Sequence, residues 1–172
     1  MKLNNFFVIS ATALTMASSA VYAADDVATA DAIWTGAIGN SVPSSNLIIT
    51  GLGGGDIQTG ELYVTSEGTF TSSKVVLEAR DFDSENSTTG DRQPLANWTY
   101  VTSQVLVGGQ LTQDAQVSVF NGGTELTAAA PNSYQGSYVE LTVANTTDIQ
   151  DIPVEGTAQV IVQMAASYDG SL

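Results

Sequence analysis

The sequence predicts an all-β protein, a single β-sandwich of about eight or nine short strands. Short segments in which apolar and polar residues alternate recur along the chain. Glycine and asparagine separate these segments, and no segment shows a convincing helical period. Alternation with a period of two is the pattern of a strand with one buried face. No internal repeat or linker indicates a second folded domain.

The stretch 25–38 predicts the first strand, and its inward row is unusual. The row that starts at Ala28 is almost entirely small around one large ring, and its members are Ala28, Ala30, Ala32, Trp34, Gly36 and Ile38. The intervening row is mostly polar. Small residues suit a strand that lies in a groove whose walls are already lined by other side chains. The alternative is an ordinary first strand of a β-sandwich.

The next strands are predicted from short alternating runs and their turns. Leu47–Thr50 is an apolar run that stops at a glycine-rich turn. Glu61–Thr65 alternates, and Ser66–Thr69 is typical of a tight hairpin turn before Phe70. Lys74–Phe82 predicts a strand covered on both faces at its start. The long polar stretch Asp83–Asn97 predicts an exposed loop.

The second half of the chain continues this pattern. Asn97–Val107 is rich in aromatic and β-branched residues, which favours a strand. Ala115–Phe120 alternates and leads into Asn121–Gly123, the strongest hairpin signal in the sequence. Ser137–Ala144 alternates again, and Thr157–Tyr168 predicts the last strand.

The last strand has the cleanest alternation in the chain. One row is polar or mixed, with Ile161 between two glutamines. The opposite, apolar row is predicted to face the core, and its members are Ala158, Val160, Val162, Met164, Ala166 and Tyr168. A strand this regular has neighbours on both sides, so one side must pair with an earlier segment or with another chain.

Composition excludes several function classes. The chain carries 4 Lys and Arg against 18 Asp and Glu, a net charge of −14, which argues against nucleic acid and anionic lipid as partners. The sequence contains no cysteine and no histidine, so thiol nucleophiles, the usual zinc sites and the commonest general base are missing. We therefore expect no catalytic residues, metal or cofactor, and a secreted serine or carboxylate enzyme is only a minor alternative.

The first residues predict export. Residues 1–23 fit a secretory signal peptide, with Lys2 in the n-region, a short apolar core, and Val21 and Ala23 before the cleavage site. Cleavage there would leave residues 24–172. Because no later apolar run approaches membrane-spanning length, we expect a soluble or assembled protein outside the membrane.

One acidic segment, Asp81–Asn86, imitates the start of a calcium-binding loop. Its carboxylates stand at alternate positions, but Asn86 occupies the place of the required glycine. Arg92 stands where the bidentate glutamate should be. The better interpretation is a solvated acidic loop without a bound metal.

The two ends of the chain together resemble the fimbrial subunits (pilins) of the bacterial chaperone–usher pathway. The pilin C-terminal signature is a glycine, an alternating apolar strand of twelve residues and an aromatic residue, and Tyr168 follows Gly156 by twelve positions. The N-terminal runs ADAIWTGAI and SSNLIITGLG resemble the common-pilus major pilins of enterobacteria, in the cysteine-free alpha-type branch. The chain departs from the signature by continuing through Gly170, Ser171 and Leu172.

The resemblance implies an incomplete immunoglobulin-like β-sandwich that is completed by donor-strand exchange. Residues 24–38 would be the N-terminal donor-strand extension and residues 39–172 the sandwich domain. The donor face would comprise Ala28, Ala30, Ala32 and Trp34. The acceptor groove, which is also the chaperone-binding strand, would comprise Gly156, Ala158, Val160, Val162, Met164, Ala166 and Tyr168.

The implied function is that of a structural subunit of an extracellular fimbria that supports adhesion. The implied partners are copies of itself or sister pilins, a periplasmic chaperone and an outer-membrane usher, with export through the periplasm to the cell surface. The alternative is a minor or tip subunit, or a secreted binding module, that recognises a host glycan or protein. The loop Asp83–Asn97 would be its candidate surface.

Overall fold

The structure is a computed structural model that describes residues 26–34, 39, 41–112, 116–147, 149 and 157–169. The predicted signal peptide and Gly156 lie outside these residues. Within them the chain forms strands and one short 3-10 helix, and the elements in chain order are β1 (Asp26–Trp34), β2 (Ser41–Val42), β3 (Leu47–Thr50), η1 (Leu52–Gly54), β4 (Leu62–Val64), β5 (Phe70–Ser72), β6 (Val75–Asp83), β7 (Thr88–Arg92), β8 (Asn97–Val107), β9 (Gln110–Thr112), β10 (Val117–Asn121), β11 (Thr124–Glu125), β12 (Tyr134–Gln135), β13 (Tyr138–Asn145) and β14 (Ala158–Tyr168).

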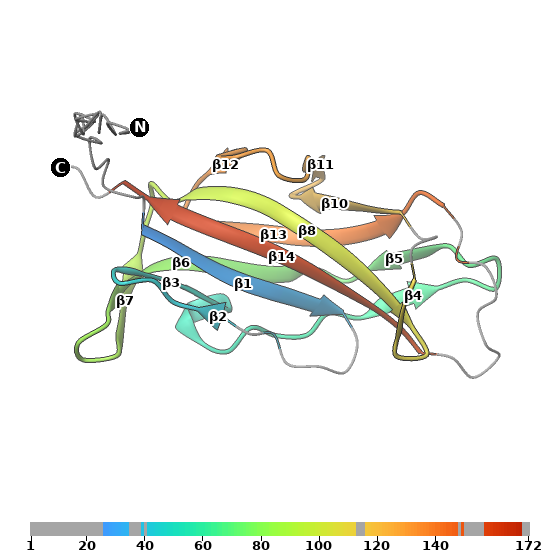
Figure 1. Ribbon diagram of the computed structural model, residues 1–172, viewed down its shortest axis with the longest axis horizontal. Coiled ribbons are helices and arrows are strands. Elements are labelled where there is room, and N and C mark those ends of the chain that lie inside the picture. Colours follow the sequence, from blue (N-terminus) through green and yellow to red (C-terminus); the bar gives the residue numbers. More distant parts are fainter. Residues whose placement is uncertain are drawn as a thin grey trace, which may run out of the picture.

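The strands form two antiparallel sheets, so the all-β prediction is confirmed (Figure 1). The first sheet has the order β12-β8-β14-β1-β2, with β9 paired to β8. The second has the order β11-β10-β13-β5-β4, and β6 also pairs with β13 and carries β3 and β7. Their inward rows enclose a common core, consistent with a β-sandwich.

Two tryptophans are fully buried in this core, one near each end of the first sheet's long strands. Trp98 of β8 donates its indole N–H to the carbonyl of Gly136 at 2.8 Å. Trp34 of β1 donates to the carbonyl of Ser73 at 2.9 Å. A buried indole keeps its polar atom satisfied in this way while the rings fill the core.

Several strand predictions are confirmed. β14 alternates buried and half-buried residues along its length, as its sequence predicted, and only Tyr168 departs by being half-buried. The predicted hairpin at Asn121 joins β10 and β11, and its two turn residues, Gly122 and Gly123, both have positive φ (56° and 87°). That conformation suits glycine and explains the strength of the signal.

One prediction is wrong. The stretch Asp83–Asn97 is not a loop throughout, because Thr88–Arg92 forms β7 and pairs with β6. Every residue of β7 is exposed, so this strand has no buried face. Alternation arises only when one face of a strand is buried, and β7 therefore gives no such pattern.

Candidate functional site

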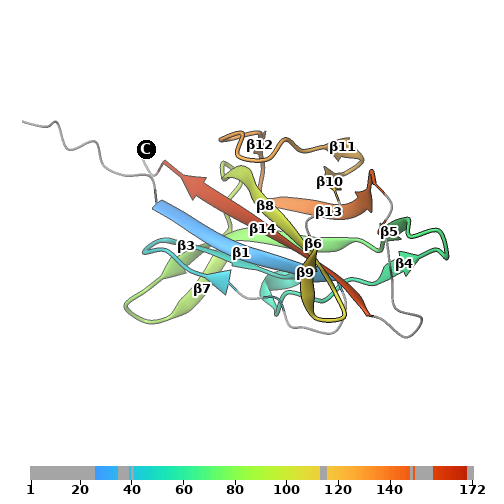
Figure 2. The ribbon, with the colours of Figure 1, turned by 45° about the vertical axis from the view of Figure 1, so that its right-hand side comes forward.

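The N-terminal strand β1 lies between β14 and β2, and Figures 1 and 2 show it running beside the C-terminal strand. Each residue of β1 has an antiparallel partner in β14. β2 pairs only with Thr29 and Ala30. We call the position between β14 and β2 the β1 seat.

The inward row of β1 is the one predicted from its small residues. Ala28, Ala32 and Trp34 have no exposed surface, and Ala30 is 3% exposed. Across the seat wall the register pairs Ala28 with Ala166, Ala30 with Met164, Ala32 with Val162, and Trp34 with Val160. In the middle of the strand, Ala30 and Ala32 lie beside the larger Met164 and Val162, whereas at the C-terminal end Trp34 is itself the large residue beside Val160.

The wall itself is the inward row of β14. Val160, Val162 and Ala166 have no exposed surface, and Met164 is 1% exposed. β8 pairs with β14 on the side away from β1. If β1 left the seat, one edge of β14 would lose its hydrogen-bonded partner and this apolar row would be uncovered. An open edge beside a bare core is a strong aggregation hazard.

Trp34 fixes the C-terminal end of β1 against the second sheet's strands. Its indole bonds to Ser73, in the segment between β5 and β6, and Gly60 N–H donates to the carbonyl of Ile33 at 2.9 Å. A Cβ on Gly60 would lie 2.2 Å from Cδ1 of Trp34, so only glycine leaves room for the ring. This contact could not be predicted from the sequence, because its partners lie far apart in the chain.

Asp26 fixes the opposite end of β1. Its carboxylate accepts the backbone N–H of Ser45 at 3.1 Å and of Asn46 at 2.7 Å, just before β3. Between the two ends, the outward row includes Asp31, whose pKa is raised because burial disfavours its charged form. Asp26 and Trp34 thus hold β1 through side-chain hydrogen bonds at its two ends.

The role of β1 as a strand given to another molecule stays a prediction. In the single chain, β1 fills the seat of its own sandwich. The chain that joins β1 to β2 runs from residue 35 to residue 40, and this connection lies mostly outside the described residues. The residues expected to form donor face and groove wall are brought together; Gly156 lies outside the described part, and Tyr168 is half-buried.

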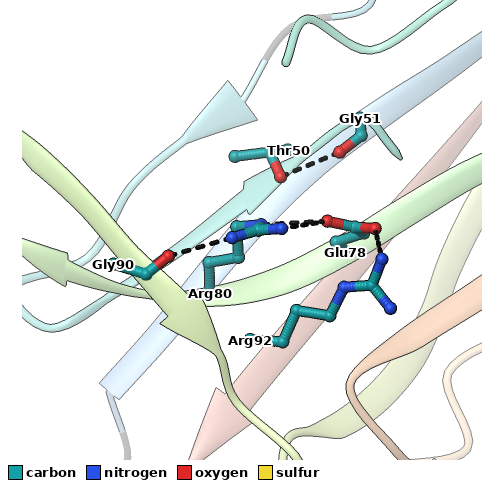
Figure 3. Close-up of polar contacts among 6 residues, drawn as sticks. All are labelled: Thr50, Gly51, Glu78, Arg80, Gly90 and Arg92. Carbon is teal, nitrogen blue, oxygen red and sulfur yellow. Dashed lines mark hydrogen bonds and ion pairs between the residues drawn. The ribbon is translucent and has the colours of Figure 1, made fainter. Parts of the chain in front are cut away.

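A buried ion cluster in the second sheet was not predicted. Glu78 of β6 is fully buried and lies between two arginines (Figure 3). Its Oε2 accepts Nε of Arg80 at 2.9 Å and lies 2.8 Å from Nη2 of the same residue. Its Oε1 forms an ion pair with Arg92, in a contact that lacks hydrogen-bond geometry. We call Glu78, Arg80 and Arg92 the Glu78 cluster.

The Glu78 cluster ties β6 to its neighbours. Arg80 also donates to the carbonyl of Gly90 in β7 at 3.0 Å, as Figure 3 shows. The Arg92 guanidinium lies 5.8 Å from the centre of the Tyr138 ring, at the start of β13. Burial raises the pKa of Glu78, but the backbone N–H of Gly53 and the two guanidinium groups outweigh it and hold that pKa below its ordinary value. Glu78 is therefore ionised at neutral pH.

In the acidic segment Asp81–Asn86, side-chain hydrogen bonds stabilise the turn between β6 and β7. Asp83 accepts the backbone N–H groups of Glu85 and Asn86 through Oδ1 and the Asn86 side chain through Oδ2. These bonds lower the pKa of Asp83. Within the described residues no group of three or more acidic side chains is placed to hold a metal ion. Asp83 thus closes the turn between β6 and β7.

The described part of the chain contains no helix of the length and apolarity needed to cross a membrane. Comparison of the chain with protein-family models, with curated proteins and with solved structures finds no match to any of them.

Proposed function

We propose that this protein is a structural subunit of an extracellular fimbria that polymerises head to tail by donor-strand complementation. In this proposal the sandwich is of the immunoglobulin-like type, and its final strand is β1 of the next subunit. The observation that carries the proposal is the β1 seat, where an N-terminal strand with a small inward row completes the sheet beside the C-terminal strand. The role is structural and requires no catalytic residue.

An identical strand from another copy would make the same contacts in the seat as the chain's own β1. Exchange of an identical element between copies is a low-cost route to assembly. Because each copy would give its strand to one neighbour and receive a strand from another, the contact is heterologous and extends into a filament. The paired length of β1 supplies a row of main-chain hydrogen bonds to such an interface.

The chain's own β1 competes with a neighbour's strand. A tethered strand acts at a high effective concentration, so the closed form is favoured over exchange in dilute solution. Polymerisation therefore needs a partner that keeps the seat open until the next subunit arrives. The resemblance to pilins supplies such partners, a periplasmic chaperone and an outer-membrane usher.

A pair of cysteines on the outward rows of β1 and β14 tests this proposal. Thr29 lies opposite Ala165, and both are half-buried. The natural chain contains no cysteine, so the introduced pair is the only one that can form a disulfide. Directly opposite strand residues have the Cα separation that a disulfide needs. We expect Thr29→Cys with Ala165→Cys to produce a ladder of covalent multimers when fibres sheared from the producing cell are oxidised and run without reductant.

The matched control is Thr29→Cys with Ile161→Cys. Ile161 lies opposite Ile33, four residues further along, or about 13 Å from Thr29, so no disulfide should form in either arrangement. Fibres that contain only intramolecular Thr29–Ala165 cross-links contradict strand exchange. A wild-type protein that never forms fibres in its own host contradicts the fimbrial function as a whole.

A further inference from the structure

A hollow of about 320 Å³ lies at the edge of the sandwich opposite the β1 seat. It is lined by the β10–β11 hairpin, by the segment that leads to β12 and by Tyr134 of β12. These elements lie at the top of Figure 1. β12 and β11 are the edge strands of the two sheets there. The lining residues are Asn121, Thr124, Glu125, Leu126, Thr127, Ala130, Ser133 and Tyr134.

The lining combines one aromatic ring with several hydrogen-bonding side chains. Tyr134 is 38% exposed, and its ring packs on Gly136, where an added Cβ would lie 2.9 Å from the ring. Glu125 contributes a carboxylate whose Oε1 accepts the hydroxyl of Ser118 at 2.5 Å, so its second oxygen remains as an acceptor. Asn121 accepts the backbone N–H of Glu140 through Oδ1, so its side-chain NH2 is the group that can donate to a ligand.

The segment that encloses the hollow is fixed to the sandwich. Ala129 N–H donates to the carbonyl of Tyr100 at 2.7 Å, and Asn132 N–H donates to the hydroxyl of Thr99 at 3.1 Å. Ala129 and Asn132 have positive φ, 56° and 52°, a conformation that non-glycine residues adopt rarely. Backbone held in such a conformation by surrounding bonds is characteristic of preformed sites.

The charge of the protein restricts the class of ligand. All three Lys and Arg residues of the described part are engaged in ion pairs, Lys74 with Glu140 and both arginines with Glu78. The chain as a whole carries a net charge of −14. An anionic ligand would meet repulsion and no available cation, whereas a neutral ligand rich in hydroxyl groups would not.

We propose that this hollow binds a neutral pyranose sugar. The Tyr134 ring offers an apolar surface for the C–H face of the sugar, and covering an aromatic ring in this way removes apolar area from water. Glu125 and Asn121 offer an acceptor and a donor for neighbouring hydroxyls, with Thr124 and Thr127 beside them. The size of the hollow falls at the lower end of ligand sites, which suits one or two sugar rings.

The site does not depend on the proposed function. It lies on the opposite edge of the first sheet from β1, so it stays accessible whether β1 fills its own seat or another one. If the subunits do polymerise, each copy presents one hollow, and weak single contacts add up on a surface that carries many sugars.

Saturation-transfer NMR with defined sugars tests the proposal on the purified protein. The probes are the methyl glycosides of galactose, glucose, mannose and N-acetylglucosamine, with the methyl glycoside of N-acetylneuraminic acid as the anionic comparison. We expect transfer to at least one neutral glycoside and none to the anionic one. Tyr134→Ala should weaken the affinity about tenfold. Glu125→Gln should also weaken it, because the amide is a poorer acceptor.

The matched control is Tyr63→Ala. Tyr63 is 54% exposed on β4 in the second sheet and lines no part of this hollow, so its loss should leave the affinity unchanged. Circular-dichroism melts of the three variants check that each is folded. The proposal is overturned if no neutral glycoside binds at millimolar concentration, if Tyr134→Ala binds like the wild type, or if the anionic glycoside binds best.

Discussion

The β1 seat and the Glu78 cluster hold their strands in opposite ways. In the seat, alanines and one tryptophan pack on apolar side chains of β14, and polar side-chain contacts occur near the strand ends. In the cluster, one buried carboxylate joins two guanidinium groups and links β6 to β7. The side-chain packing in the seat is apolar and non-directional. The Glu78 cluster is ionic, and its one carboxylate is shared by two guanidinium groups.

This difference shows which strand contacts an identical strand from another copy could replace. Apolar packing and main-chain pairing are recovered when an identical strand takes the same place. A buried ion cluster cannot be opened without leaving a charge unpaired in the interior, which costs several kcal/mol. Separating β6 from β7 is therefore costly, whereas β1 makes contacts that an identical strand could reproduce.

The largest expected effect comes from a charge in the seat wall. Val162 is fully buried beside Ala32, so Val162→Asp should cost about 4 kcal/mol or more of the free energy of unfolding, comparable to the stability of a domain. Ile161 is half-buried on the outer row, and Ile161→Asp should cost far less. Urea unfolding and immunoblots of periplasm and surface fractions compare the two. A reversed order would mean that the inward row of β14 is assigned to the wrong face.

The second effect measures the Glu78 cluster. Glu78→Gln should lower the free energy of unfolding by about 3 kcal/mol, because both arginines lose a buried charge partner. Glu140→Gln is the control, since its pair with Lys74 is exposed and should contribute less than about 1 kcal/mol. Equal losses in the two variants, measured by urea unfolding, would contradict the ionic account.

We also expect the stability difference between the wild type and Glu78→Gln to depend on pH. The pKa of Glu78 is lowered in the folded state, so its charge stabilises the fold above the ordinary value of 4.5. That stabilisation is lost as the pH falls from there through the lowered folded pKa. The difference in melting temperature between wild type and Glu78→Gln should therefore be constant near neutrality and shrink below about pH 4.5. A melting-temperature difference that grows in acid would mean that the folded state raises the pKa of Glu78 instead of lowering it.

A smaller effect tests how tightly Trp34 is held. Gly60→Ala should lower the free energy of unfolding by about 1–3 kcal/mol, since its Cβ would press on the Trp34 ring. Gly55→Ala is the control, because its nearest neighbour would lie 3.7 Å away and its φ is not positive. Thermal melts of the two variants read out the stability. Similar costs at both glycines would show that Trp34 does not constrain residue 60.

The smallest effects concern two acids of β1 and should differ in sign. Asp31→Asn should stabilise the protein slightly at neutral pH, because the folded state disfavours its charge. This gain should vanish as the pH falls through the raised pKa, since wild-type Asp31 then becomes neutral too. Asp26→Asn should destabilise it, since one of two backbone N–H bonds loses its carboxylate acceptor. Melting temperatures at neutral and acid pH separate them, and stabilisation by both would contradict the anchoring role of Asp26.

The sequence predicted the features that follow from local periodicity. The inward rows of β1 and β14 could be predicted, because one buried face selects apolar residues at alternate positions. The hairpin at Asn121 could be predicted as well, because its turn conformation selects glycine. β7 was missed, since a fully exposed strand imposes no alternation. The Glu78 cluster and the Trp34–Gly60 contact were missed as well, because each depends on residues brought together only by the folded sheets.

The scarcity of basic residues also has a consequence for digestion. Trypsin-like proteases cut only after lysine or arginine, and the sequence offers 4 such positions, one of them Lys2. Arg80 lies inside β6, Arg92 ends β7, and Lys74 directly precedes β6. Cleavage at a strand requires local opening, so its rate follows the small population of opened molecules. We therefore expect the folded protein to be cut slowly by trypsin at Arg80, which lies inside β6, and faster at Lys74, which lies outside a strand.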